Sequence, residues 1–478
     1  MIVRSRDITV DAKLIKGVME EFTKDVVPRL EKLKEAYAGK GAITKRTRSA
    51  GLPNNRLVHA YPRYIVTMAS GYLVGEPVKY ADDAQKEAVQ ALMDAYRHSS
   101  IDSVDAELAA AASTYGRGVC ICYADEDGAP RAATLSPMEA FVVYDDTVEH
   151  KPMFGVHWLN KHDAAGKVIG VQVHVHTAAE DMIFEGKTAS SLGGIPLVKP
   201  HYFGGVPMVE FWNNAEETGD FEPVLSLIEA YDVLESDRVN DKQQFTDAVL
   251  LLTGCTLEAP EEIDEEGNIV KDPRTPAQRL VEERTLSLPD TEAKAEWLVK
   301  ASDESGAETL RNAIKGEIHK MSMVPDLTDE HFAGNVSGVA MRYKLLGFEQ
   351  LTKTKERWFR EGLVARMKLF ASFLSVLAVA SLDTETVTIT FTRALPVNET
   401  EIAAMVAQLS GIVPQRALLA QLPFIEDVDK AVAELEEEQE KAAKRQADAF
   451  GGQYIDGNEP LQGEEEDEED KKKKRDDA

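Results

Sequence analysis

Two predicted helices bracket a polar, acidic segment in the middle of the 478-residue chain, and this arrangement restricts the fold more than any other stretch. The first helix covers 222–247, with Asp220 as a candidate N-cap, and the second covers 303–322. The apolar stripe of the first helix consists of Val224, Leu227, Ile228, Tyr231 and Leu234. This pattern is typical of an elongated assembly protein rather than of an enzyme.

A loop and a very long helix follow this pair. Pro325 ends the second helix, and two glycines make the segment up to residue 337 flexible. From Ser337 to about Leu382 the pattern is helical, which corresponds to about 65–70 Å at 1.5 Å per residue. Gly347 and Gly362 are candidate bends. Such a long helix needs neighbours along its length, which indicates a spine or an oligomer.

The remaining chain mixes helices with strands. Pro28 is expected to kink or end the first helix. Asp127-Gly128 predicts the turn of a β-hairpin. Helices are predicted over 11–37, 57–75, 83–113 and, as two or three short ones, 399–447. Strands are predicted at GVCICYADEDGAPRAATL, FVVYDD, FGVHWL, VIGVQVHVHT, AVLLLTG, TLSLP and VTITFTRALPVN. The class is therefore α+β and mainly helical.

The candidate metal ligands of the chain are histidines and cysteines. His174 and His176 share one face of a predicted strand and offer two imidazoles to a metal. No third ligand stands at a sensible spacing, so a half-exposed strand face is the preferred interpretation. Cys120 and Cys122 are expected to pack on one face of another strand, and with Cys255 they suggest no disulfide framework. We therefore predict no metal and no cofactor.

The chain is strongly acidic, with 83 Asp and Glu against 54 Lys and Arg and a net charge of −29. A protein that wraps DNA needs clustered bases to displace counterions, so any DNA contact is expected to be weak or local. Lys45, Arg46 and Arg48 form one basic link, which is read as a solvated loop or as a contact with nucleic acid or an acidic neighbour.

No membrane or export signal is predicted. The N-terminus lacks an apolar core of the signal-peptide kind. The longest apolar run, from Leu369 to Leu382, is shorter than the roughly 20 residues that span a bilayer. The three cysteines fit a reducing compartment. A soluble, cytoplasmic protein is therefore expected.

Four common catalytic and nucleotide-binding motifs are missing from the sequence. The phosphate loop G-x-x-x-x-G-K, the dinucleotide motif G-x-G-x-x-G after a strand, H-E-x-x-H and G-x-S-x-G are all missing from the sequence. Carboxylates are abundant, so pairs such as Glu261 and Glu262 carry little information. No catalytic residue is predicted.

Four segments resemble the portal proteins of tailed bacteriophages, of the long-tailed siphovirus type. They are RLVHAYPRYIVTMASGYLVGEPVKY, the stretch from VPMVEFWNNAEETGDF to AVLLLTG, MVPDLTDEHFAGNVSGVAMRYKLLGFEQL, and ITFTRALPVNETE with the LPFIEDVDKAVAELEEE stretch after it. They occupy residues 56–80, 206–254, 323–351 and 389–401. Their order and spacing match the family over most of the chain.

The resemblance implies a portal fold with an α/β wing, a two-helix stem, a small α/β clip, a long spine helix and a helical crown. Its regions would be 1–221 and 338–397 (wing), 222–247 and 303–322 (stem), 248–302 (clip), 323–337 (tunnel loop) and 398–450 (crown). The charged tail 451–478 lies outside the resemblance and is expected to be disordered because it cannot build a core.

The resemblance also implies a ring, usually of twelve subunits, at one capsid vertex, with assembly in the host cytoplasm. Double-stranded DNA would pass through its channel without sequence readout during packaging and ejection. Further implied partners are the terminase large subunit, a head-tail connector, and capsid and scaffold proteins. The candidate tunnel-loop residues are Asp326, Thr328, Asp329, His331, Phe332 and Asn335. The candidate lumen-facing bases of the stem are Arg311, Lys315 and Lys320.

Two alternatives stay open from the sequence. One is a ring-forming scaffold protein outside phages that uses the same long helices. The other is a hydrolase that acts through surface carboxylates, which predicts turnover and a small oligomer.

Overall fold

A computed structural model describes most of the chain and divides it into two compact units, Met1–Leu395 and Pro396–Ala478. The described residues are 1–49, 52–188, 191–246, 249–253, 262–263, 269–270, 294–298, 304–327, 338–393, 399–419, 422, 425 and 428–451. The chain contains both helices and strands, and the predicted α+β class is confirmed.

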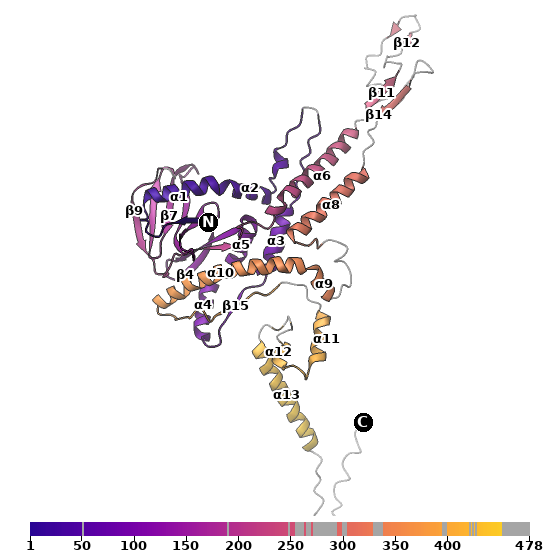
Figure 1. Cartoon of the computed structure of the whole chain (residues 1–478). Helices are drawn as coiled ribbons and strands as arrows, with labels where there is room; N and C mark the ends of the chain where they lie inside the picture. The colour runs from indigo at the N-terminus through magenta and orange to yellow at the C-terminus, as the bar shows by residue number, and fades with distance from the viewer. Residues whose placement is uncertain are drawn as a thin grey trace, which may run out of the picture. The chain divides into compact units, whose positions relative to one another are not determined.

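A six-stranded sheet dominates the N-terminal part (Figure 1). Its spatial order is β1-β5-β6-β7-β8-β9; β1 runs parallel to β5, and the other neighbours are antiparallel. The strands are β1 (Ile2–Arg4), β5 (Ala140–Asp145), β6 (Pro152–His162), β7 (Val168–His176), β8 (Glu180–Gly186) and β9 (Gly193–Pro200). The predicted strands FVVYDD, FGVHWL and VIGVQVHVHT are thus confirmed.

Helix α1 (Ala12–Asp25) covers one face of this sheet (Figure 1). Asp11 caps it, because its carboxylate accepts from the Leu14 N–H at 2.7 Å. The buried side of α1 contributes Ile15 and Phe22 to a core with residues of β5, β6 and β7. Helix α2 (Val27–Tyr37) carries Pro28 as its second residue, so the break predicted at this proline is confirmed.

A second sheet, in the order β10-β3-β4, stands beside the first. Strands β3 (Arg117–Ala124) and β4 (Pro130–Leu135) form the predicted hairpin, and β10 (Met208–Trp212) pairs with β3. Cys120 and Cys122 are buried there, as expected. The predicted helix 83–113 is instead two helices, α4 (Lys86–His98) and α5 (Ile101–Tyr115), because Ser100 takes a left-handed conformation with φ of 51°.

The long helix is shorter than predicted and has a break near its start. Helix α9 (Gly338–Lys344) is separated by Leu345 from α10 (Leu346–Val376), and the segment from Leu377 to Leu382, which was predicted to continue the helix, is not helical. Gly362 lies inside uninterrupted α10, where a Cβ would come within 2.6 Å of the Phe211 ring. Its role is close packing, and the break that the sequence placed at glycines occurs at Leu345.

Buried ion pairs tie α10 to the rest of this unit. Arg366 donates to both carboxylate oxygens of Asp105 at 2.5 and 3.1 Å. Lys355 pairs with Asp220, which also accepts from Ser113 and from Asn213. The prediction that Asp220 caps a helix is wrong, since its carboxylate is committed to this buried cluster and Phe221 is the N-cap of the first helical turn, η3 (Glu222–Val224).

Helix α3 (Tyr61–Val74) confirms the predicted helix 57–75 except for its first residues, which are extended. A small ladder joins β2 (Lys79–Ala81) to β15 (Thr388–Thr390). The remaining elements of this unit are the short η1 (Ala42–Lys45), the helices α6 (Leu225–Thr246) and α8 (Glu304–Ser322), and strand pairs in the acidic segment.

Helices α6 and α8 run side by side, and the strands β11 (Val249–Thr253) and β14 (Lys294–Leu298) pair beyond them (Figure 1). A two-residue ladder joins β12 (Glu262–Ile263) and β13 (Ile269–Val270). The predicted helices 222–247 and 303–322 and the strand AVLLLTG are confirmed, whereas TLSLP lies outside the described residues. Strand β14 was not predicted.

The C-terminal unit is helical where it is described. It contains α11 (Glu399–Leu409), α12 (Gln415–Leu419) and α13 (Val428–Gly451). Gly411, with φ of 85°, makes the turn after α11. Helices were expected here, but α13 is longer than the short helices predicted. The tail from residue 452 lies outside the described residues, as does its expected disorder.

Candidate functional site

The paired helices α6 and α8 are held together by alternating charges. Arg238 of α6 contacts Glu308 of α8 at 3.0 Å and Glu304 at 3.7 Å, while Glu235 of α6 contacts Arg311 of α8 at 3.3 Å. Because bases and acids alternate on both helices, a shift of one helix along the other would bring like charges together. This network therefore fixes the register of the pair.

The charged groups of this network shift one another's pKa values. The Glu308 carboxylate, together with the Tyr231 hydroxyl, raises the pKa of Arg311. Arg311 in turn lowers the pKa of Glu308, and Lys242, 2.8 Å away, lowers that of Glu304. All of these groups face solvent to some extent, so water screens each pair and its contribution to the free energy of unfolding is small. Their effect is on geometry more than on stability.

A row of buried polar side chains on α6 holds the extended segment that precedes α3. The amides of Asn55, Leu57 and His59 donate to three α6 side chains at 2.7, 2.9 and 2.9 Å. The acceptors, in the same order, are Asn240, Ser236 and Asp232. Two residues of extended chain advance about 6.6 Å and four residues of helix about 6.0 Å, so the two repeats stay in step.

The predicted basic link lies against this same helix. Arg46 and Arg48 both contact the Asp237 carboxylate of α6, Arg46 at 2.8 Å, and Lys45 contacts Glu35 at 2.6 Å. Of the interpretations that the sequence left open, the acidic neighbour is the one the structure supports. Arg46 and Arg48 therefore stabilise the attachment of α6, while Lys45 contacts α2.

The first residues of the predicted tunnel loop are anchored to α3 and α8. The Tyr64 hydroxyl donates to the Pro325 carbonyl at 2.8 Å and accepts from the Leu327 amide at 3.3 Å. Asp326 lies 2.7 Å from Lys315 and 3.8 Å from His319, both on α8. Burial raises the pKa of Tyr64, so its hydroxyl stays protonated. The start of the loop therefore has a fixed position.

The candidate site residues divide into three groups. Arg311 and Lys315 are described, but their charges are paired with acids of the same unit. Lys320 is exposed, and no acid lies within ion-pair distance among the described residues. Thr328, Asp329, His331, Phe332 and Asn335 lie outside the described residues, so of the predicted loop residues the structure places only Asp326.

An apolar hollow of about 680 Å³ lies on the paired helices. Val233 and Leu310 are exposed within it, Leu310 by 51%. Its other lining residues are Ala42, Ile43, Arg46, Glu229, Ala230, Leu234, Asp237 and Ile314. A solvent-facing surface of this kind on a charged helix pair is typical of a contact with another protein.

The helix pair has the features of a structural element. Most of its described charged side chains are paired with one another or with groups of the segments packed against the two helices, which is typical of a supporting element rather than of a catalytic site. Sequence reasoning missed the buried row Asp232, Ser236 and Asn240. Its signal is a polar residue every fourth position on a helix that also carries an apolar stripe.

Among the described residues, no helix combines the length and the apolarity needed to cross a bilayer.

Known proteins match this chain over most of its length. The family described as "Phage portal protein, SPP1 Gp6-like" matches residues 20–445. The portal protein of Bacillus phage SPP1 is 25% identical over 426 residues, which cover 82% of this chain and 78% of that protein. The portal protein of Clostridium phage phiCD119 is 22% identical over 430 residues, which cover 86% and 91% respectively.

A solved structure titled "Neck of empty GTA particle computed with C6 symmetry" aligns with 85% of this chain and 92% of its own chain, at 14% identity and a TM-score of 0.42.

Proposed function

The chain belongs to the phage portal protein family of the SPP1 Gp6-like type, and from this premise we propose that copies of it form a ring whose channel carries the viral DNA. The resemblance that four sequence segments carry is thereby confirmed. This family consists of structural, non-enzymatic proteins, and membership makes the chain a structural component of the phage virion. The channel, the docking partners and the roles of single residues are our proposal.

The observation that carries the proposal is the helix pair α6 and α8. At 22 and 19 residues, the two helices extend for about 33 and 28 Å at 1.5 Å per residue. A ring of such pairs encloses a channel with a wall one pair thick. We assign 222–247 and 303–322 to this stem and 323–337 to a tunnel loop that narrows the channel.

The other regions follow from the same proposal. We assign 1–221 and 338–397 to a wing that contains the six-stranded sheet and α10. We assign 248–302 to a clip and 398–450 to a crown. The clip docks the terminase large subunit during packaging and the head-tail connector afterwards, and its acidic stretch from Glu258 to Asp272 is the docking surface we favour. The ring occupies a capsid vertex.

The apolar hollow supports the ring. Leu310 and Val233 are 51% and 42% exposed in a single copy. Complete burial of a fully exposed Leu or Val contributes about 1.5–3 kcal/mol, so covering these two side chains contributes roughly half of that for each. We infer that the stem of the next subunit covers them. The charged network on the pair then positions this apolar face toward the neighbour.

The acidity of the chain suits passage of DNA better than tight binding. A ring of twelve carries a formal charge of about −348, twelve times the −29 of one chain. Repulsion acts over about 8 Å at physiological salt and keeps the duplex centred. Lys320 is the stem base left for transient contact with phosphates, since Arg311 and Lys315 are paired internally. Such contacts carry no sequence information.

Electron microscopy of the purified full-length chain tests the ring. We expect rings with a central hole for the wild type, and mostly monomers for Leu310→Asp, which places a carboxylate in the hollow. Val148→Asp is the control, because Val148 is fully exposed in a turn away from the hollow. Wild-type monomers at all concentrations would contradict the proposal.

Packaging assays test the channel. Lys320→Glu rings should package less DNA than wild-type rings, because the transient phosphate contact is lost. Tight, sequence-specific binding of wild-type rings to a short duplex would contradict passage without readout.

A further inference from the structure

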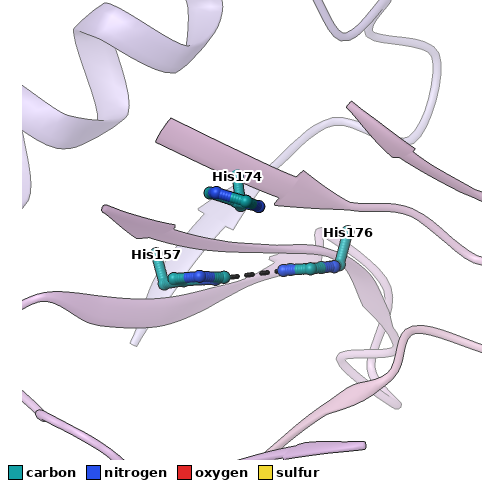
Figure 2. A group of neighbouring side chains, drawn as sticks. All are labelled: His157, His174 and His176. Carbon is teal, nitrogen blue, oxygen red and sulfur yellow. Dashed lines mark hydrogen bonds between the residues drawn. The ribbon is translucent and has the colours of Figure 1, made fainter. Parts of the chain in front are cut away.

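Three histidines from two neighbouring strands meet on one face of the six-stranded sheet (Figure 2). His157 lies on β6, and His174 and His176 lie on β7. Each offers a ring nitrogen, and the three nitrogens lie within 4.8 Å of one another. His157 is thus a third candidate ligand beside His174 and His176, and the prediction that none exists is wrong.

The strand register brings the three together. His157 is directly opposite His174, and Gly155 is directly opposite His176. Because side chains alternate along a strand, all three imidazoles lie on the face away from α1, whose core takes Val156, Val173 and Val175. A glycine at position 155 is required there, since a Cβ would come within 2.4 Å of the Met208 sulfur.

Two of the three imidazoles are enclosed. His157 is 8% and His176 5% exposed, so the expected half-exposed face is wrong for His176, whereas His174 is half-buried. Burial, followed by the neighbouring His176 and His174, lowers the pKa of His157 to about 3. Burial and His176 also lower the pKa of His174. The neutral form of imidazole is the one that binds metals.

Two contacts complete the arrangement. The Asp181 carboxylate bonds Nδ1 of His176, which leaves Nε2 of that ring pointing at Nδ1 of His157, 3.0 Å away (Figure 2). A carboxylate behind an imidazole is the usual outer partner of a metal-bound histidine, because it fixes the ring and increases its basicity. Nε2 of His174 is buried and has no hydrogen-bond partner.

We propose that His157, His174 and His176 bind one divalent transition-metal ion, with Zn²⁺ as the favoured ion. Three imidazoles and no thiolate or further carboxylate in the cluster match the nitrogen-rich sites of zinc. At Zn–N distances of about 2.0–2.1 Å, tetrahedral ligands stand about 3.3 Å apart, so the 3.0 Å pair must open slightly and the third nitrogen must approach by less than about 2 Å.

The bound ion supplies the missing partner of His174 and links β6 to β7. It binds the folded sheet and not the unfolded chain, so it stabilises this region in proportion to its concentration over its dissociation constant. Three protein ligands leave a fourth position for water or an added ligand. This role is independent of the channel, and loss of the ion is compatible with intact rings.

Metal binding to the full-length chain, without a polyhistidine tag and stripped with a chelator, tests the proposal. We expect one Zn²⁺ per chain by titration calorimetry and elemental analysis, and a Zn²⁺-dependent rise in the unfolding temperature. His174→Gln should weaken binding at least 10-fold and abolish the rise. Asp181→Asn should weaken binding about 10-fold or more, as outer partners of metal-bound histidines do.

His162→Gln is the matched control, because His162 is exposed at the end of the same strand β6. It should bind Zn²⁺ as the wild type does, and the acidic tail is common to all variants. Co²⁺ provides a second measurement, since imidazole ligation gives the wild type a visible absorption band that His174→Gln lacks. Equal Zn²⁺ binding by the wild type and His174→Gln, or no stoichiometric binding by the wild type, would overturn the proposal and leave a neutral His157–His176 hydrogen bond in its place.

Discussion

His59 makes two contacts with Asp232: its backbone N–H and its ring Nδ1 each lie 2.9 Å from the same carboxylate oxygen. Asp232 is buried on α6, and burial raises its pKa although the His59 contacts oppose this effect. The pair is the last of three steps by which the extended segment before α3 follows α6. It joins the proposed stem to the helix that also holds the start of the proposed tunnel loop.

Replacing Asp232 should loosen this attachment. Asp232→Ala leaves the His59 amide without its acceptor, and a buried unsatisfied donor costs about 1–3 kcal/mol. We expect a lower unfolding temperature in calorimetry. Glu229→Ala is the control on the same helix, because its contact with Lys32 is largely exposed and should change stability by less than about 1 kcal/mol. Equal decreases in the unfolding temperature for the two substitutions would show that the buried row contributes no more to stability than an exposed ion pair does.

Two glycines of α10 should respond in opposite directions to alanine. A Cβ at Gly362 would overlap the Phe211 ring at 2.6 Å, so Gly362→Ala should destabilise the fold by about 1–3 kcal/mol. A Cβ at Gly347 meets nothing within 4 Å, so Gly347→Ala should stabilise the helix by up to about 1 kcal/mol. Denaturant unfolding of both variants measures the difference. A neutral Gly362→Ala would contradict the packing described for α10.

Acid should weaken the contact between Arg29 and Glu222. Partial burial raises the pKa of Glu222, but the Arg29 guanidinium and the Gly219 amide outweigh it, and the net pKa lies below its ordinary value of 4.5. A carboxylate with a lowered pKa stabilises the fold fully above its unfolded pKa, and this contribution is lost as the pH falls through the folded pKa.

For each protein, the loss of stability is measured between neutral pH and a pH below about 4.5. This loss should be larger for the wild type than for Glu222→Gln. Unfolding temperatures recorded across this range check the slope. Glu76→Gln is the exposed control and should follow the wild-type profile. Parallel profiles for the wild type and Glu222→Gln would refute the linkage.

The start of the proposed tunnel loop should depend on one hydroxyl. Tyr64→Phe removes the bonds to the Pro325 carbonyl and the Leu327 amide, and each such bond stabilises by about 0.5–1.5 kcal/mol. We expect the Leu327 amide to exchange hydrogen faster in the variant. Tyr343→Phe is the control, because that side chain is 75% exposed. Unchanged exchange at Leu327 would show that other contacts, such as Asp326 with Lys315, suffice.

Local pattern predicted most of the helices and strands but not where each helix breaks. Pro28 marked the α1–α2 boundary correctly because proline removes an amide and fixes φ. The break at Leu345 carries no such mark, and the glycines offered as bends proved irrelevant or closely packed. Strand β14 was missed because its sequence KAEWL begins with Lys, Ala and Glu, which are depleted in strands.

The sequence by itself determined the element types, the helix pair around an acidic segment and the family, since these depend on neighbouring residues and on short segments that resemble the family. Only the tertiary structure decided which polar groups meet. Asp220 looked like a helix cap, yet it pairs with Lys355, 135 positions away. His157 joins His174 because of strand register, and His59 joins Asp232 because two backbone repeats run in step. Burying a charge or an amide is costly unless a partner is present, and partners distant in sequence become neighbours only when the chain packs.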